Sequence, residues 1–97
     1  MSERRTYPVL ININDRTILK VIIDSHYEIK HKESIDDITI LKLVQTLDGK
    51  TFVPEVEKDG FMYFKTEPLL LNKKNYRLIW LLENDELYIG VINAFRR

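Results

Sequence analysis

Residues 76–95, YRLIWLLENDELYIGVINAF, decide the predicted fold because they hold two apolar segments separated by a short polar turn. Both segments, 76–83 and 87–95, are rich in the aromatic and β-branched residues that strands favour. Between them, Asn84 and Asp85 have side chains typical of a tight turn. The stretch therefore predicts an antiparallel hairpin.

A two-residue loop at 84–85 fixes which residues of this hairpin face each other. The predicted cross-strand pairs are Glu83–Glu86, Trp80–Ile89, Arg77–Ile92 and Tyr76–Asn93. Alternation then puts the bulkier side chains on the Trp80 face, which we expect to lie under a helix. The opposite face carries apolar residues that either the first hairpin or a partner must cover, namely Ile79, Leu81 and Ile92.

The rest of the chain predicts more strands and two helices. Segments 7–13 and 17–23 alternate as strands around Asn14-Asp15 and indicate an N-terminal hairpin. Serines with an acidic residue three positions later begin two predicted helices, at 26–33 and 35–47.

Two further strands precede the last hairpin. Segment 52–57 contains Pro54, which favours an edge position, and Asp59-Gly60 predicts a tight turn into a strand at 61–66. Segment 71–75, LNKKN, is interpreted as a loop.

These elements predict a single α+β domain spanning residues 1–97. Its expected architecture is an N-terminal β-hairpin, two consecutive helices and then a four-stranded antiparallel meander, with the helices on one face of the sheet.

Composition narrows the functional classes. The 97 residues include 15 basic and 15 acidic side chains, so no overall field favours nucleic acid or a membrane surface. Cysteine is absent, which excludes disulfides and thiolate sites and fits the cytoplasm. No apolar run approaches the roughly 18 residues that a membrane span needs, so we expect no membrane partner.

The only two histidines, His26 and His31, lie in a charged stretch. On a helix they would point about 140° apart, so no metal site and no cofactor is expected. His26 shares a helical face with Lys30, whose charge would lower the imidazole pKa and suit a general base. The alternative is a polar, solvated helix without a catalytic role.

Two arginines near the end of the sequence, Arg77 and Arg96, share one predicted sheet face, with Tyr88 nearby. Guanidinium groups bind phosphate through two parallel hydrogen bonds. The alternative is a structural arginine whose aliphatic carbons pack over the core while its guanidinium group is solvated. Arg4, near the start of the sequence, is interpreted as solvated.

The stretch LNKKNYRLIWLLENDELYIGVINAFRR, 71–97, resembles the C-terminal part of RelE/ParE-like toxins. In those toxins a short basic loop leads into a YRLxW-type strand, a tight turn and a last strand ending in arginine. The run SHYEIKHKESIDDITILKLV, 25–44, resembles the helical start of small related domains in the wider barnase, EndoU, colicin nuclease and RelE ribonuclease group. The likeness spans residues 25–97.

The resemblance implies metal-independent RNA cleavage by attack of the 2′-OH on the neighbouring phosphate, and a cognate antitoxin as partner. It assigns the following roles by motif position: His26, His31, Arg77 and Tyr88 catalytic, Lys30 and Arg96 phosphate-binding. A second hypothesis is a non-enzymatic, protein-binding or immunity-type module of similar fold, which acts through a sheet face or edge or as a homodimer. The neutral charge favours this second hypothesis because such toxins are usually strongly basic.

Overall fold

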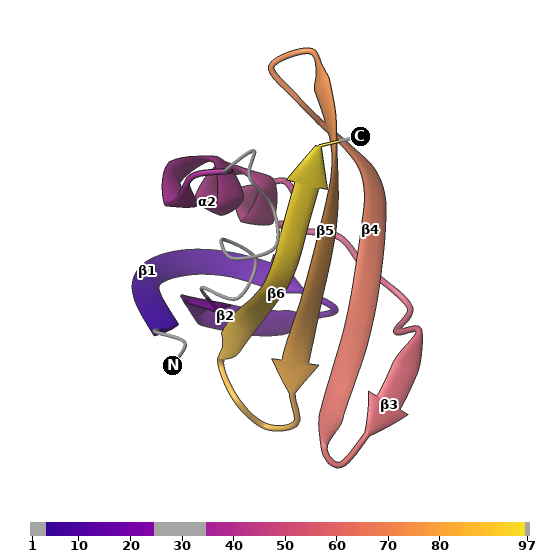
Figure 1. Cartoon of the computed structure of the whole chain (residues 1–97). Coiled ribbons are helices and arrows are strands. Elements are labelled where there is room, and N and C mark those ends of the chain that lie inside the picture. The colour runs from indigo at the N-terminus through magenta and orange to yellow at the C-terminus, as the bar shows by residue number, and fades with distance from the viewer. Residues whose placement is uncertain (1–3, 25–34, 97) are drawn as a thin grey trace.

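The computed structural model describes residues 4–24 and 35–96. Their strands form one six-stranded sheet in the order β1-β2-β6-β5-β4-β3 (Figure 1). The elements in chain order are β1 (Arg4–Ile13), β2 (Arg16–Asp24), α2 (Asp37–Gln45), β3 (Val56–Lys58), β4 (Phe61–Leu71), β5 (Lys74–Glu83) and β6 (Tyr88–Arg96). Among these residues, no helix is long and apolar enough to cross a membrane.

The pairing of β2 with β6 joins the two ends of the sequence. It is parallel, with Lys20 opposite Tyr88 and Ile22 opposite Gly90, whereas the other neighbouring strands are antiparallel. Figure 1 shows β1 and β2 crossing β4, β5 and β6 at a steep angle. The sheet is therefore strongly bent, and its inner side wraps around the core.

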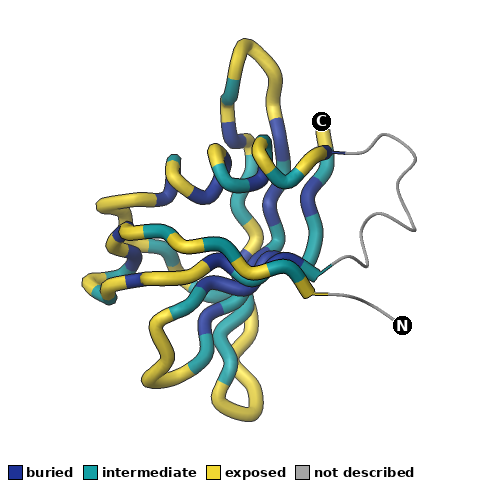
Figure 2. Tube along the Cα trace, turned by 90° about the vertical axis from the view of Figure 1, so that its left-hand side faces the viewer, coloured by how far each residue is buried: buried dark blue, intermediate teal, exposed yellow. Residues whose placement is uncertain are grey.

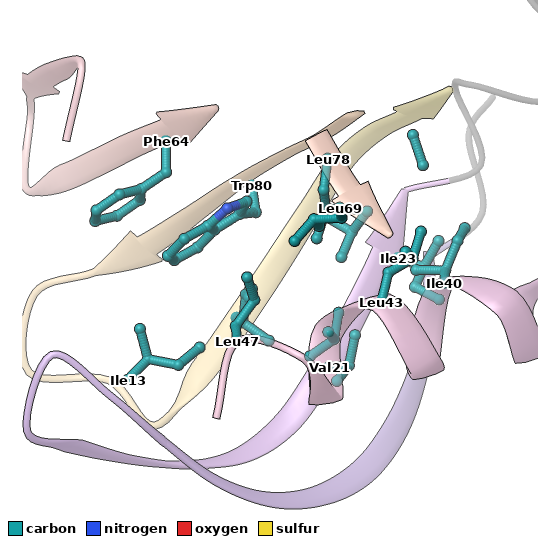
Figure 3. Packing of buried hydrophobic residues seen from close by; sticks show 14 of the residues in the cluster. Ile13, Val21, Ile23, Ile40, Leu43, Leu47, Phe64, Leu69, Leu78 and Trp80 are labelled. Carbon is teal, nitrogen blue, oxygen red and sulfur yellow. The ribbon is translucent and has the colours of Figure 1, made fainter. Parts of the chain in front are cut away.

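The core lies between α2 and the inner side of the bent sheet. Figure 3 shows Leu43 of α2 among side chains from the N-terminal hairpin and from β5. Trp80 is fully buried, stacks on Phe64 with ring centroids 4.0 Å apart, and donates its Nε1–H to Thr66 Oγ1 at 3.0 Å. In Figure 2, buried segments of several strands come together in the middle of the molecule. The expected burial of the Trp80 face is confirmed for part of its length, since Leu87 is exposed and Phe95 is only half-buried. The buried members of this face are Tyr76, Leu78, Trp80, Leu82, Ile89 and Val91.

The predicted α+β architecture of two helices and a four-stranded meander is wrong. The part of the chain that the structure describes contains one nine-residue helix, and all six strands belong to one mixed sheet. The predicted N-terminal hairpin is confirmed, but it extends the sheet through β6, so β6 is an interior strand. The predicted helix at 26–33 lies outside the described residues.

The predicted helix at 35–47 is shorter in the structure. Asp36, rather than Ser34, is the N-cap, and its side chain accepts a hydrogen bond from the Thr39 N–H at 2.9 Å. The helix then runs from Asp37 to Gln45. An aspartate that accepts from a free backbone N–H begins a helix as effectively as a serine does.

The predicted register of the last hairpin is also wrong. A two-residue type I′ loop needs positive φ at both residues, but of the pair only Asp85 has it, at 64°. Strand β6 therefore begins only at Tyr88, and a bulge follows further along the strand. The observed pairs are Trp80–Val91, Ile79–Asn93, Arg77–Phe95 and Tyr76–Arg96.

Strands β3 and β4 differ from their predicted lengths for local reasons. The edge strand shrinks from 52–57 to three residues, whereas β4 continues beyond 66 to Leu71. Pro68 lies between Thr66 and Leu69, where the register of β4 and β5 is irregular. Proline has no backbone N–H to donate, and at this position no regular hydrogen bond between the strands is lost. The predicted loop at 71–75 narrows to a turn at Asn72 and Lys73, both with positive φ.

A charged cluster holds α2 against β1. Arg5 donates from Nε and Nη2 to the two carboxylate oxygens of Asp37, at 2.5 and 2.8 Å. The Tyr7 hydroxyl donates to the same carboxylate, and this hydrogen bond raises the Tyr7 pKa. Asp37 lies in the first helical turn, where a negative charge also favours the helix dipole.

We expect Asp37→Asn to lower the melting temperature by about 4–8 °C, the shift that a loss of about 1 kcal/mol produces in a domain of this size. The amide carries no negative charge and offers one acceptor oxygen in place of two, so the ion pair with Arg5 is lost. Thermal unfolding followed by circular dichroism measures the shift. Asp15→Asn, in an exposed turn, is the matched control. Equal melting temperatures for the two variants would show that the cluster does not hold the helix.

Candidate functional site

A pocket of about 360 Å³ opens on the face of the sheet opposite α2, which we call the open face. Alternation along β5 places Trp80 and Leu82 in the core and Leu81 and Glu83 on the open face. The pocket lies where β2 meets β6, and its lining comes from five strands. The lining residues used below are Arg4, Ile22, Asp24, Phe61, Tyr63, Leu81, Glu83, Tyr88, Gly90 and Ile92.

Gly90 is a buried residue of the pocket lining, and the Leu81 side chain packs closely over it. A Cβ at this position would lie 3.0 Å from Leu81 Cδ1 and 3.6 Å from Tyr88 Cε2. Its backbone is in the ordinary extended region, so the glycine is required by space and not by φ. Any side chain at position 90 would therefore have to displace Leu81.

Tyr88 and Glu83 form a hydrogen-bonded pair inside the pocket. The Tyr88 hydroxyl donates to Glu83 Oε1 at 2.6 Å. Burial, with the Glu83 hydrogen bond as the next cause, raises the pKa of Tyr88 to about 12. The end of β5 is fixed by Arg16, whose Nη1 donates to the Glu83 carbonyl at 2.7 Å. The hydrogen bond to Glu83 therefore fixes the position of the Tyr88 hydroxyl, which keeps its proton at neutral pH.

Charges of both signs surround this pair. Arg4 lies close enough to Tyr88 that its guanidinium partly offsets the rise in the Tyr88 pKa. Asp24 is the cross-strand partner of Arg4, and Lys20 pairs directly with Tyr88 across β2 and β6. The site thus combines cations, carboxylates and a protonated phenol, an arrangement able to bind a phosphate and to transfer protons.

Three of the predicted site residues, His26, Lys30 and His31, lie outside the described residues. In the sequence, His26 comes two residues after Asp24, which lines the pocket. Tyr88 is the predicted site residue that the structure places in the pocket.

The two arginines that were predicted as site residues do not lie beside Tyr88. Arg77 forms an ion pair with Glu67, and its guanidinium lies 5.5 Å from the centre of the Phe95 ring. Arg96 lies at the opposite end of β6 from Tyr88, eight residues or roughly 26 Å along the strand. The prediction that the two arginines share one face is wrong, because the bulge in β6 places Phe95 opposite Arg77 and places Arg96 opposite the buried Tyr76, on the other side of the sheet.

Sequence reasoning missed Arg4 and Glu83 as pocket residues. Arg4 was interpreted as solvated, and Glu83 was paired with Glu86 in the wrong hairpin register. The Arg4 error follows from the parallel β2–β6 pair, which brings distant segments together without a local pattern, and the Glu83 error follows from the longer loop between β5 and β6. The sequence pattern that could have located the pocket is the alternation of side chains, which puts Tyr88 and Gly90 on one face.

Comparisons with protein families, with curated proteins and with solved structures give no match. Within residues 4–24 and 35–96, no three His, Cys, Asp or Glu side chains are grouped so that they could hold a metal ion. The chemistry of the pocket itself is what points to a function.

Proposed function

We propose that the chain is a cytoplasmic, metal-independent ribonuclease of the RelE-like toxin type that cleaves RNA at the open-face pocket. The observation that supports this most strongly is the Tyr88–Glu83 hydrogen bond beside Arg4. Tyr88 is also one of the residues that the resemblance implies as catalytic. A cognate antitoxin would be the partner of such a toxin.

In the proposed reaction the ribose 2′-OH attacks the adjacent phosphorus while the bond from phosphorus to the 5′-oxygen breaks. His26 takes the 2′-OH proton, and Tyr88 gives its proton to the leaving 5′-oxygen. With a pKa near 12, Tyr88 still carries that proton at neutral pH. Arg4 supplies positive charge for the phosphate oxygens, and the products are a 2′,3′-cyclic phosphate and a 5′-hydroxyl.

The other residues implied by the resemblance have supporting roles in this proposal. Arg77, near the start of β5, and Arg96, at the end of β6, would contact phosphates of the flanking RNA. Lys30 would bind phosphate, and His31 would be a second proton-transfer candidate.

Purified protein should cleave single-stranded RNA in the presence of EDTA and leave 2′,3′-cyclic phosphate ends, which mass spectrometry identifies. A DNA oligonucleotide of the same sequence is the matched control, because it lacks the attacking 2′-OH and should stay intact. His26→Ala should remove both the cleavage and any growth arrest on expression. Intact RNA after incubation with the wild-type protein would overturn the proposal.

The second candidate is a non-enzymatic module that binds a protein partner, or a second copy of itself, through the open face. Its specific support is that Ile79, Leu81 and Ile92 on this face are only half-buried. The sheet edges are less suited to docking. At the β1 edge, Asn12 already bonds Asp48 Oδ1 and the Gly49 N–H, and β3 has only three residues.

This alternative predicts a dimer in sedimentation and a function that does not depend on His26. A monomer at all concentrations, together with a phenotype that His26→Ala removes, would exclude a homodimeric module.

A further inference from the structure

We propose that the chain forms a symmetric dimer through exposed leucines on the outside of the junction between β1, β2 and the start of β6. The leucines are Leu10, Leu19 and Leu87, and we call them the leucine patch. The partner is the same patch on a second copy of the chain. The inference goes beyond the proposed ribonuclease activity and does not depend on it, because none of the three leucines lines the open-face pocket.

The first step is that the three leucines are neighbours, although they come from separate segments. Leu10 lies in the irregular stretch of the β1–β2 register, opposite Leu19. On the other side of β2, the Leu19 N–H donates to the Leu87 carbonyl at 2.7 Å. The leucine patch is therefore one continuous row across the place where β2 meets the start of β6 (Figure 1).

The second step is that this row faces solvent. The exposed fractions are 77% for Leu10, 43% for Leu19 and 46% for Leu87. By contrast, Ile11 and Ile18, which adjoin the first two leucines along the chain, are buried in the core. Leu10 and Leu19 therefore point away from the core. Single exposed apolar residues are ordinary on a soluble protein, whereas a contiguous group marks an interaction surface.

The other large apolar residues that are exposed within residues 4–24 and 35–96 belong to elements away from this junction. They lie on α2, in the loop before β3, on β3 and on β4, namely Ile38, Val53, Val56 and Leu70. In the sheet, β5 separates β3 and β4 from β6. These residues are therefore outside the leucine patch, and they supply control positions of equal or greater exposure.

The third step is the pair of opposite charges beside the patch. Lys20 follows Leu19 along β2, and Glu86 precedes Leu87. Because β2 and β6 run parallel, Lys20 and Glu86 lie on opposite sides of the row. Both residues are exposed, and in the part of the chain that the structure describes neither side chain forms an ion pair.

A second copy is the partner that this arrangement fits. A two-fold axis through the middle of the leucine patch packs leucines against leucines and brings Lys20 of each copy opposite Glu86 of the other. The result is an apolar centre with a charged rim, the usual composition of a protein interface. A strongly acidic partner would instead meet Glu86, and a strongly basic one would meet Lys20. Such a symmetric contact closes after two copies, so it predicts a dimer and not a filament.

Sedimentation of the whole chain over a range of concentrations should show a monomer–dimer equilibrium. Leu10→Glu should weaken dimerisation at least tenfold, because it places an unpaired charge among the leucines. Leu70→Glu introduces the same charge at an exposed leucine of β4, so it is the matched control and should dimerise as the wild type does. Circular dichroism checks that both variants are folded.

A charge exchange tests which residues meet across the axis. Lys20→Glu and Glu86→Lys should each weaken dimerisation about three- to tenfold, because each variant sets like charges opposite one another. An equimolar mixture of the two variants should dimerise as the wild type does, since every glutamate then meets a lysine of the other chain. Both positions are exposed, so neither change should disturb the fold. The mixture therefore separates a contact between chains from one within a chain.

A wild-type chain that sediments as a monomer at every concentration would overturn the inference. So would a mixture that associates no better than either charge variant alone. A dimer that Ile79→Lys removes and Leu10→Glu retains would lie on the open face and would also overturn it. A dimer that meets these tests while RNA stays intact supports the leucine patch and overturns the proposed ribonuclease activity, so the two failures are distinguishable.

Discussion

Replacing Trp80 with alanine is expected to lower the free energy of unfolding by about 3–5 kcal/mol, the range found for large buried aromatic residues. Trp80 is fully buried, stacks on Phe64 and meets the edge of the Phe52 ring, with centroids 5.4 Å apart. Small domains have only about 5–15 kcal/mol of stability in total, so this single change should remove a large share of it. Urea unfolding followed by far-ultraviolet circular dichroism measures the change, because tryptophan fluorescence is lost with the side chain.

Trp80→Phe is the matched variant for this experiment. It keeps an aromatic ring against Phe64 and loses the hydrogen bond from Nε1 to Thr66, so its effect should be clearly smaller, about 1–3 kcal/mol. If the alanine and phenylalanine variants are equally stable, the stacking of an aromatic ring at position 80 on Phe64 does not stabilise the core.

Removing the Tyr88 hydroxyl in Tyr88→Phe is expected to lower the RNA cleavage rate about 10²–10⁴-fold, the usual contribution of general acid catalysis. The ring remains in the pocket, so the folded structure should be kept. Phenylalanine cannot donate a proton to the leaving oxygen, and it leaves Glu83 without its 2.6 Å hydrogen-bond donor. Single-turnover cleavage of a labelled RNA measures the rate.

Tyr76→Phe is the control, because it removes a hydroxyl from the same strand pair outside the pocket. Its cleavage rate should match the wild type. An equal loss in both variants would point to a general effect on folding, and an unchanged rate in Tyr88→Phe would remove Tyr88 from the proposed mechanism.

Local patterns predicted the strands well and their assembly poorly. Alternation at 7–13 and 17–23, and the Asp59-Gly60 turn, depend on neighbouring residues and are confirmed. The predicted architecture failed because parallel pairing of β2 with β6 depends on residues almost seventy positions apart. The alternation of residues within one segment does not indicate which distant strand will pair with that segment.

The candidate site was predictable to the same limited extent. Alternation correctly placed Tyr88 and Gly90 on one face, but a bulge near Asn93 reverses the faces of the residues that follow. Asn93 Oδ1 accepts from the Ala94 N–H at 3.0 Å, Ala94 is buried, and Phe95 turns toward Arg77. A bulge has no clear signature in a single sequence, so the placement of Arg96 on the opposite face from Arg77 could not be foreseen.

The parallel β2–β6 pair has a consequence for the order in which the protein can fold during synthesis. The N-terminal hairpin is local and can form early, but its second strand gains its sheet neighbour only when β6 has left the ribosome. The pocket straddles this junction, with Asp24 on one side and Tyr88 and Gly90 on the other. A nascent chain that stops before β6 therefore lacks the site, and any activity of the pocket begins only after β6 has been translated.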